Sequence, residues 1–202
     1  MYNIILGSGS PRRHEILTLA GIEHTVIVPE TDESKIRYVG DCQRYVKELA
    51  KLKSDALTEL IKSDEYKTKI DLSSTMTICA DTVVFSPKKP YPLGKPKNFD
   101  DACDMLKGFS GTYHYVLTGV CIRKNPTSEI IFTEETKVHF RKLTYDEIED
   151  YINVEKPFDK AGAYGIQDRA CAFVSGIEGD FYNVMGLPVC KITEKLKEMG
   201  VL

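Results

Sequence analysis

The strongest constraint on the fold of this chain is an apolar segment that runs through a short polar turn directly into a helical pattern. Residues 2–6 are apolar enough to form a buried strand, and residues 12–19 place apolar side chains at helical spacing. Between these segments, Ser10 suits the N-cap of a helix and Pro11 suits its first position. We therefore predict a strand–turn–helix unit whose turn presents backbone N–H groups at the positive end of a helix dipole.

The side chains of this turn add hydrogen-bond donors and positive charge to the exposed backbone. Two hydroxyl groups, from Ser8 and Ser10, stand beside two guanidinium groups, from Arg12 and Arg13. This combination at a helix N-terminus is typical of a site for a polyanion, and we expect a chain of phosphates as its ligand. The alternative is a simple exposed turn, or a basic site that is read by a kinase or by DNA.

Length and composition are those of a globular protein with one domain, which we expect to span residues 1–202. The net charge of −3 argues against a general nucleic-acid coat protein. The six cysteines form no CxxC pair and no Cys/His cluster, so we expect buried free thiols, with Cys79, Cys121 and Cys190 among them. The chain shows no signal-peptide pattern and no apolar run near the ~20 residues of a membrane helix, so we expect a cytoplasmic protein.

Strand and helix patterns follow one another without strict alternation, which indicates a mixed sheet flanked by helices. We predict strands over residues 2–6, 25–28, 77–85, 113–123 and 130–140, and a β-hairpin over residues 172–177 and 181–184. We predict helices over residues 12–19, 42–60, 100–107 (ended by Gly108), 144–154 (with a Thr144–Glu147 capping box) and 188–199. Residues 62–74 either extend the second helix or form a loop, and Asn125-Pro126 forms a turn between two strands.

Two acidic residues stand where a carboxylate is suited to chemistry. Asp81 interrupts the apolar strand of residues 77–85, where a buried carboxylate needs a partner, so we interpret it as a general base or a metal ligand. The alternative is an aspartate at a strand end that caps a turn. Glu33 follows Asp32 in a short loop and is a candidate for a second metal-binding carboxylate, although such pairs are also typical of exposed loops.

Three further residues are candidates for contacts with a ligand. Lys53 falls on the apolar face of the second helix, where a lysine either extends to solvent or meets an anion. Lys95 follows Gly94, which permits a close approach of the backbone. Gln167 ends a stretch of small residues, and its amide offers one donor group and one acceptor group to a base edge. The alternative for this stretch is an ordinary glycine-rich loop.

Taken in order, these stretches resemble the motifs of the Maf family of nucleoside triphosphate pyrophosphatases, along nearly the whole chain. The motifs are residues 8–13 (SGSPRR), 32–33 (DE), 49–53 (LAKLK), 80–84 (ADTVV), 94–96 (GKP), 110–112 (SGT), 160–167 (KAGAYGIQ) and 186–188 (GLP). The resemblance implies an α/β fold similar to that of the inosine triphosphate pyrophosphatases. Such a fold has an elongated mixed β-sheet flanked by helices, two lobes around a cleft and often a homodimer.

The resemblance also implies a reaction, which is metal-dependent hydrolysis of a nucleoside triphosphate to a monophosphate and pyrophosphate. It implies that Glu33 and Asp81 position Mg²⁺ or Mn²⁺ and that Asp81 takes the proton from the attacking water. It implies that Lys53 and Lys95 neutralise the charge that grows on the leaving pyrophosphate.

The residues that bind the substrate are implied by the same motifs. The resemblance assigns the triphosphate to Ser8, Ser10, Arg12 and Arg13, and the check of the pyrimidine to Thr82 and Gln167. Arg12, Thr82 and Gln167 look like the branch of the family that hydrolyses dTTP and UTP, and with them modified pyrimidine triphosphates. A sister branch, which prefers 7-methyl-GTP, differs at these positions.

Three positions depart from the usual family pattern. Gly7 and Ser54 stand where alanine is more usual, and Asp168 replaces a glycine next to Gln167. Two alternatives to the pyrimidine-specific enzyme remain, which are a purine or 7-methyl-GTP pyrophosphatase and a nucleotide-sensing regulator of cell division without turnover. The acidic balance and the lack of a basic stripe argue against nucleic acid as a partner.

Overall fold

The computed structural model describes residues 2–124 and 128–202, and the chain divides into two compact units. Unit 1 comprises Met1–Asp81, Thr118–Glu134 and Gly186–Leu202, and unit 2 comprises Thr82–Leu117 and Glu135–Met185. Among the described residues, no helix is both long and apolar enough to cross a membrane.

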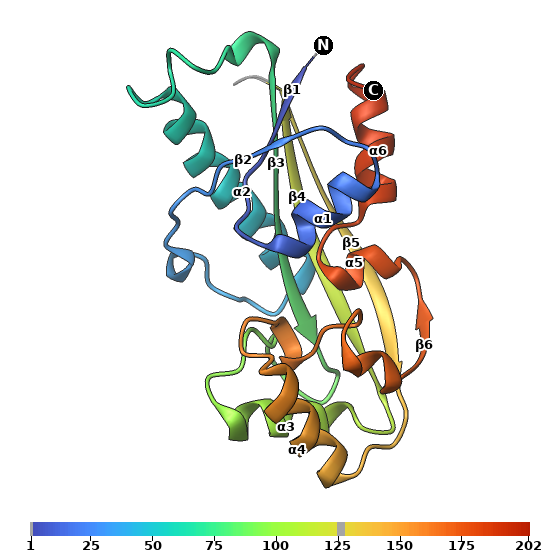
Figure 1. The fold of residues 1–202 in the computed structure, drawn as a ribbon. Helices are drawn as coiled ribbons and strands as arrows, with labels where there is room; N and C mark the ends of the chain where they lie inside the picture. The colour runs from blue at the N-terminus through green and yellow to red at the C-terminus, as the bar shows by residue number, and fades with distance from the viewer. Residues whose placement is uncertain (1, 125–127) are drawn as a thin grey trace. The chain divides into compact units, whose positions relative to one another are not determined.

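The six strands form one mixed sheet, which confirms the predicted α/β class. Its strand order is β2-β1-β3-β4-β5-β6 (Figure 1). β1 is parallel to both β2 and β3, whereas β5 and β6 are antiparallel. The strands are β1 (Asn3–Leu6), β2 (Thr25–Val26), β3 (Thr75–Phe85), β4 (Tyr113–Lys124), β5 (Ser128–Phe140) and β6 (Val174–Glu178).

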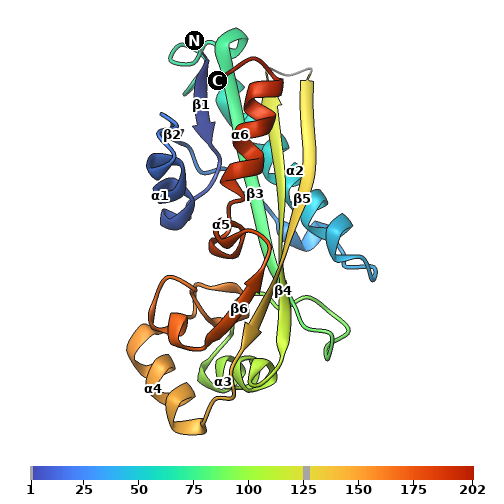
Figure 2. The same cartoon turned by 90° about the vertical axis from the view of Figure 1, so that its right-hand side faces the viewer.

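In unit 1, helices cover both faces of the sheet. Helix α2 (Cys42–Lys62) lies on one face and α6 (Val189–Glu198) on the other (Figure 2). Gly119 of β4 permits the close approach of α2, because a Cβ atom at this position would lie 2.1 Å from the carbonyl oxygen of Val46. Helix α1 (Pro11–Leu19) follows β1, so the predicted strand–turn–helix unit is confirmed.

Unit 2 has a core rich in aromatic side chains. Helix α3 (Phe99–Phe109) packs against α4 (Tyr145–Glu155), and the capping box predicted for α4 is formed by Thr144 and Glu147. Short 3₁₀ helices connect the larger elements in both units, at Glu33–Lys35 and Leu72–Ser74 in unit 1 and at Ala161–Ala163 and Arg169–Ala172 in unit 2.

The predicted β-hairpin over residues 172–184 is wrong. Its first half is β6, which pairs with β5, and its second half is the short helix α5 (Phe181–Met185). Asp180 favours the helical start because its carboxylate accepts a hydrogen bond from the Tyr182 N–H at 2.7 Å. Asn183 is fully buried and donates to the carbonyl of Val116 and to the Thr136 hydroxyl, both at 3.0 Å, which fixes the turn of helix.

Smaller corrections concern the ends of elements and one thiol. Helix α3 continues through Gly108, because Phe109 is fully buried in the core and holds the extra residues in the helix. For residues 62–74 the loop alternative holds, because α2 ends at Lys62, turns follow it and Leu72–Ser74 form a short 3₁₀ helix. Cys79 and Cys121 are buried free thiols as predicted, but Cys190 is exposed. The predicted Asn125-Pro126 turn lies outside the described residues.

Candidate functional site

The turn after β1 is held by Arg13, whose guanidinium group is fixed by three hydrogen bonds. It donates to the carbonyl oxygens of Ala80 at 2.7 Å and Gly186 at 2.8 Å, and to the Ser8 hydroxyl at 3.1 Å. Burial lowers the pKa of Arg13, and the charge of Asp81 opposes this shift. Arg13 therefore supplies a positive charge of fixed position beside the end of β1.

The start of α1 keeps the features of an anion site. Ser10 occupies the N-cap position and Pro11 the first turn, but the Ser10 side chain makes no capping hydrogen bond. The first turn holds no acidic residue, and Arg12 lies half-buried in it. The turn therefore combines a helix N-terminus, serine hydroxyls and arginines without a nearby carboxylate on the same helix turn.

The glycine at position 7 has a steric cause in this chain. A Cβ atom at Gly7 would lie 2.4 Å from the Sγ atom of Cys79 and 2.8 Å from a methyl carbon of Leu57. Both neighbours are fully buried, so neither has room to move away. The glycine is therefore matched to the larger side chains that pack against this strand.

Three predicted residues meet in one charged cluster, which consists of Glu33, Lys53 and Asp81. The Nζ atom of Lys53 lies 2.9 Å from Glu33 Oε1 and makes a short hydrogen bond to Asp81 Oδ1. Asp81 is only 9% exposed and lies inside β3, so its burial is compensated by the lysine and it caps no turn. The apolar strand therefore delivers a carboxylate that has an ionic partner from α2.

The donor atoms of this cluster fit a divalent metal in part. Glu33 and Asp81 converge on one cation, the Lys53 ammonium group, and carboxylate oxygens are the ligands that Mg²⁺ and Mn²⁺ prefer. Within residues 2–124 and 128–202, no group of three or more His, Cys, Asp or Glu side chains is placed to hold a metal. A metal bound here would therefore need further oxygen ligands from water or from a phosphate.

The pKa of the Tyr45 hydroxyl is raised by burial and by the same cluster. This tyrosine lies on α2, and burial together with the negative charges of Asp81 and Glu33 raises its pKa. Its ring makes an edge contact with Tyr38, with the ring centroids 5.7 Å apart. No sequence pattern indicated that Tyr45 borders the charged cluster.

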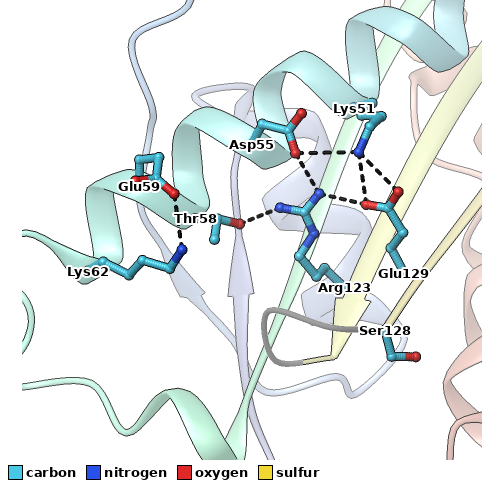
Figure 3. A pocket seen from close by; sticks show the side chains of 8 residues that line it. All are labelled: Lys51, Asp55, Thr58, Glu59, Lys62, Arg123, Ser128 and Glu129. Carbon is cyan, nitrogen blue, oxygen red and sulfur yellow. Dashed lines mark hydrogen bonds and ion pairs between the residues drawn. The ribbon is translucent and has the colours of Figure 1, made fainter.

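The opposite face of α2 is anchored by Arg123, which positions the helix that carries Lys53. Figure 3 shows Arg123 between α2 and β5, where its guanidinium group donates to Asp55 and Glu129, both at 2.6 Å, and to the Thr58 hydroxyl at 2.7 Å. Lys51 reaches Glu129 at 3.0 Å from the same helix. These groups line an open cavity of about 460 Å³. Its charged side chains are paired, Lys51 with Glu129 and Arg123 with Asp55.

In unit 2, the loop of Lys95 is connected to the loop of Gln167. The Gly162 N–H donates to the Gly94 carbonyl at 3.0 Å, and a Cβ atom at Gly162 would lie 2.8 Å from a methyl group of Val84. Val84 also pairs with Leu93 in a short bridge. Lys95 itself is exposed, so its ammonium group is accessible to solvent.

Hydrogen bonds of two buried tyrosine hydroxyl groups hold the Gln167 loop in place. The Tyr164 hydroxyl lies 2.7 Å from Nε2 of His114, and the Gly165 N–H donates to the Tyr151 hydroxyl at 3.2 Å. Burial lowers the pKa of His114 to about 3, so the ring is neutral, and it stacks on Phe109 with the ring centroids 4.0 Å apart. Sequence reasoning missed His114 and Tyr151, because each is an isolated residue far from the motif it supports.

The structure thus brings together some of the predicted site residues within each unit. In unit 1, Ser8 contacts Arg13, and Lys53 joins the two predicted metal ligands. Ser10 and Arg12 lie in the same turn as Ser8. In unit 2, Thr82 is half-buried in β3, and Gln167 is exposed.

Comparisons with known proteins agree with the sequence motifs. A family model described as Maf-like protein matches residues 3–199. A dTTP/UTP pyrophosphatase of Lachnoclostridium phytofermentans is 42% identical over 205 residues, which cover 100% of this chain and 97% of that protein. A dTTP/UTP pyrophosphatase of Clostridium botulinum (strain 657 / Type Ba4) is 43% identical over 202 residues, which cover 100% and 99%.

Solved structures with a similar fold are Ham1 proteins. The Staphylococcus aureus Ham1 protein has a TM-score of 0.52 at 12% identity, with 98% of this chain and 99% of that chain covered. A HAM1 protein from Coxiella burnetii has a TM-score of 0.51 at 12% identity, with 98% and 100% covered. At this identity the likeness concerns the fold alone, and it confirms the predicted fold class.

Proposed function

Because the chain belongs to the Maf-like protein family, we propose that it is a metal-dependent pyrophosphatase that hydrolyses dTTP and UTP. Its products are the nucleoside monophosphate and pyrophosphate, and modified pyrimidine triphosphates are further substrates. The observation that carries the proposal is the cluster in which Lys53 joins Glu33 and Asp81. A nearly buried carboxylate with an ionic partner is suited to acid–base chemistry on a polyanionic substrate.

The triphosphate is bound by the turn after β1. Ser8, Ser10 and the N-terminus of α1 donate hydrogen bonds to phosphate oxygens, and Arg12 and Arg13 supply positive charge. Arg13 is suited to this role because three hydrogen bonds already fix its guanidinium group. A prearranged charge stabilises a polyanion without the cost of ordering a flexible side chain.

Asp81 is the general base in this proposal. Its carboxylate accepts the proton of the attacking water as the bond between the α and β phosphates breaks. Lys53 orients that carboxylate through its hydrogen bond, and Lys53 and Lys95 stabilise the charge on the departing pyrophosphate. Glu33 and Asp81 would hold Mg²⁺ or Mn²⁺, which, when bound, lowers the pKa of a water molecule and offsets phosphate charge.

In this proposal Gln167 and Thr82 recognise the pyrimidine base. The exposed amide of Gln167 presents a donor group and an acceptor group that match the O4 and N3–H groups of uracil and thymine. We further propose a cytoplasmic location, where these nucleotides are found, and a homodimeric assembly.

The experiment that tests the function measures pyrophosphate release by the purified protein with Mg²⁺ or Mn²⁺. The substrates are dTTP, UTP, dUTP, CTP, ITP, GTP and 7-methyl-GTP. We expect selective turnover of dTTP and UTP, and none after chelation of the metal. Turnover of ITP or 7-methyl-GTP instead would contradict the proposed specificity, and folded protein without any turnover would favour a nucleotide-sensing regulator.

A further inference from the structure

Asp168 closes the loop that presents Gln167. Its carboxylate accepts hydrogen bonds from the Tyr151 hydroxyl, at 3.1 Å to Oδ1 and 3.2 Å to Oδ2, and from the Ala170 N–H at 2.9 Å. The Lys160 ammonium group lies 3.9 Å from Oδ2. The carboxylate therefore contacts α4, the start of the loop and the segment that follows it.

The loop needs such contacts because its backbone is strained. Gly162 and Ala163 both adopt left-handed conformations, with φ angles of 72° and 62°. A left-handed alanine costs roughly 1–2 kcal/mol, so it persists only where neighbouring contacts hold it. The two residues that follow this strained pair are held by hydrogen bonds, Tyr164 to His114 and Gly165 to Tyr151.

Asp168 and Gly165 are sterically matched to each other. A Cβ atom at Gly165 would lie 2.5 Å from Oδ2 of Asp168 and 3.0 Å from the side chain of Lys160. Because Gly165 has no side chain, the Asp168 carboxylate fits beside the loop and also reaches Tyr151. The Tyr151 oxygen accepts from Gly165 and donates to Asp168, so one hydroxyl joins both ends of the Gly165–Asp168 segment.

Gln167 is exposed between two fixed neighbours. Ile166 is 5% exposed and belongs to the core cluster of unit 2, and Asp168 is held by the contacts described above. The backbone of Gln167 is therefore fixed on both sides, although its side chain is accessible to a ligand.

A fixed backbone matters because the amide of Gln167 must meet a base edge at hydrogen-bond distance. Uracil and thymine present an acceptor at O4 beside a donor at N3, whereas cytosine presents a donor at N4 beside an acceptor at N3. The two ends of the glutamine amide match either edge, depending on how the amide is turned. The turn of the amide needs no movement of the backbone, so the fixed backbone sets where the amide meets the base edge.

We propose that Asp168, through Tyr151, is a positioning residue that holds Gln167 where its amide contacts the O4 and N3–H edge of uracil and thymine. This inference rests on the proposed function. It assigns a role to a residue that differs from the glycine usual at this position.

The test compares kcat and KM for dTTP, UTP and CTP in the wild type, Asp168→Gly, Asp168→Asn and Asp159→Gly. The wild type comes first, since a protein that does not prefer dTTP and UTP refutes the proposed function itself. If the wild type prefers dTTP and UTP, we expect Asp168→Gly to raise KM for dTTP about tenfold, because one hydrogen-bonded contact is lost. The value of kcat should change less than about threefold. Asp168→Asn keeps an oxygen acceptor and restores most of the selectivity.

Asp159→Gly is the matched control, because Asp159 is an exposed aspartate that pairs with the same Lys160. It leaves the ratio of kcat/KM for dTTP to kcat/KM for CTP unchanged. If Asp168→Gly does not fold, Tyr151→Phe breaks the same hydrogen bond by removing the hydroxyl donor, and it is expected to lower the same ratio. A wild-type ratio in a folded Asp168→Gly or Tyr151→Phe variant, or an equal loss of kcat on all substrates, overturns the positioning role.

Discussion

The two units hold their candidate functional groups by different means. In unit 1, charged side chains fix one another, as Lys53 does with Glu33 and Asp81. In unit 2, the loop of Gln167 is held mainly by hydrogen bonds of hydroxyl groups and backbone amides, joined by the Asp168 carboxylate, and the Gln167 side chain is left exposed. Loss of one charge in unit 1 leaves a partner uncompensated, whereas loss of one bond in unit 2 is shared among several contacts.

This difference suits different tasks. Groups that stabilise developing charge need strong and prearranged electrostatics, and the cost of burying them is offset by mutual pairing. A group that selects one base needs a defined position more than it needs charge. We therefore expect substitutions in unit 1 to lower turnover of all nucleotides, and substitutions around Gln167 to change which nucleotide is preferred.

The largest effect is expected for Asp81→Asn. Loss of a general base lowers kcat by about 10²–10⁴-fold, and the asparagine oxygen still accepts a hydrogen bond from Lys53, so the fold is retained. Pyrophosphate release measures kcat, and thermal unfolding checks the fold. The control is Asp64→Asn, an aspartate of unit 1 whose side chain is 92% exposed, which keeps wild-type turnover. Near-normal activity of Asp81→Asn would exclude Asp81 as the base.

The next effect is expected for Lys53→Gln. It lowers kcat/KM by about 10²-fold on every nucleotide, because a charge that stabilises the transition state is lost. It also costs about 1–3 kcal/mol of unfolding free energy, because Asp81 is left buried without its ionic partner. Lys51→Gln is the matched control on the same helix, where the side chain is 43% exposed and faces Glu129. A change in nucleotide preference without loss of turnover would contradict the assignment.

A smaller effect is expected for Gln167→Ala. The variant loses about tenfold in kcat/KM for dTTP and UTP and little for CTP, because only the recognised base edge is affected. Steady-state kinetics on the three nucleotides measures the ratio, and Gln43→Ala, an exposed glutamine on α2, serves as the control. Equal losses on all three nucleotides would show that Gln167 does not read the base.

The smallest effect concerns stability alone and tests the support of unit 2. His114 has a pKa of about 3 in the folded chain because of burial, so the unfolded chain binds a proton below its own pKa of about 6.5 and the folded chain does not. Stability is therefore lost as pH falls below about 6.5, by about 2 kcal/mol between pH 7 and pH 5. Urea unfolding at both pH values checks this, and His114→Asn should lose that share of the dependence. An equal dependence in both proteins would contradict a buried neutral His114.

The sequence allowed prediction of those features whose causes are local. The N-cap and proline at the start of α1, the capping box of α4 and the carboxylate inside β3 each follow from neighbouring residue types. The motifs also placed Lys53 and Asp81 in one site, and the structure brings them into contact.

Long-range contacts account for what the sequence did not reveal. The segment after β6 has the pattern of a strand, but the buried Asn183 favours the helix α5 through hydrogen bonds to Val116 and Thr136, which lie 67 and 47 positions away. His114 and Tyr151 support the Gln167 loop, although each is far along the chain from its partner. His114 is 50 positions from Tyr164, and Tyr151 is 14 positions from Gly165. No local pattern marks such pairs.

The most direct test of the central claim compares nucleotide preference in Lys53→Gln and Gln167→Ala, measured as the ratio of kcat/KM for dTTP to that for CTP. The account predicts that Lys53→Gln lowers both values and leaves the ratio within about twofold of the wild type. It predicts that Gln167→Ala lowers the ratio about tenfold. The opposite pattern, with preference lost in Lys53→Gln and kept in Gln167→Ala, would contradict the division of chemistry and base selection between these two groups.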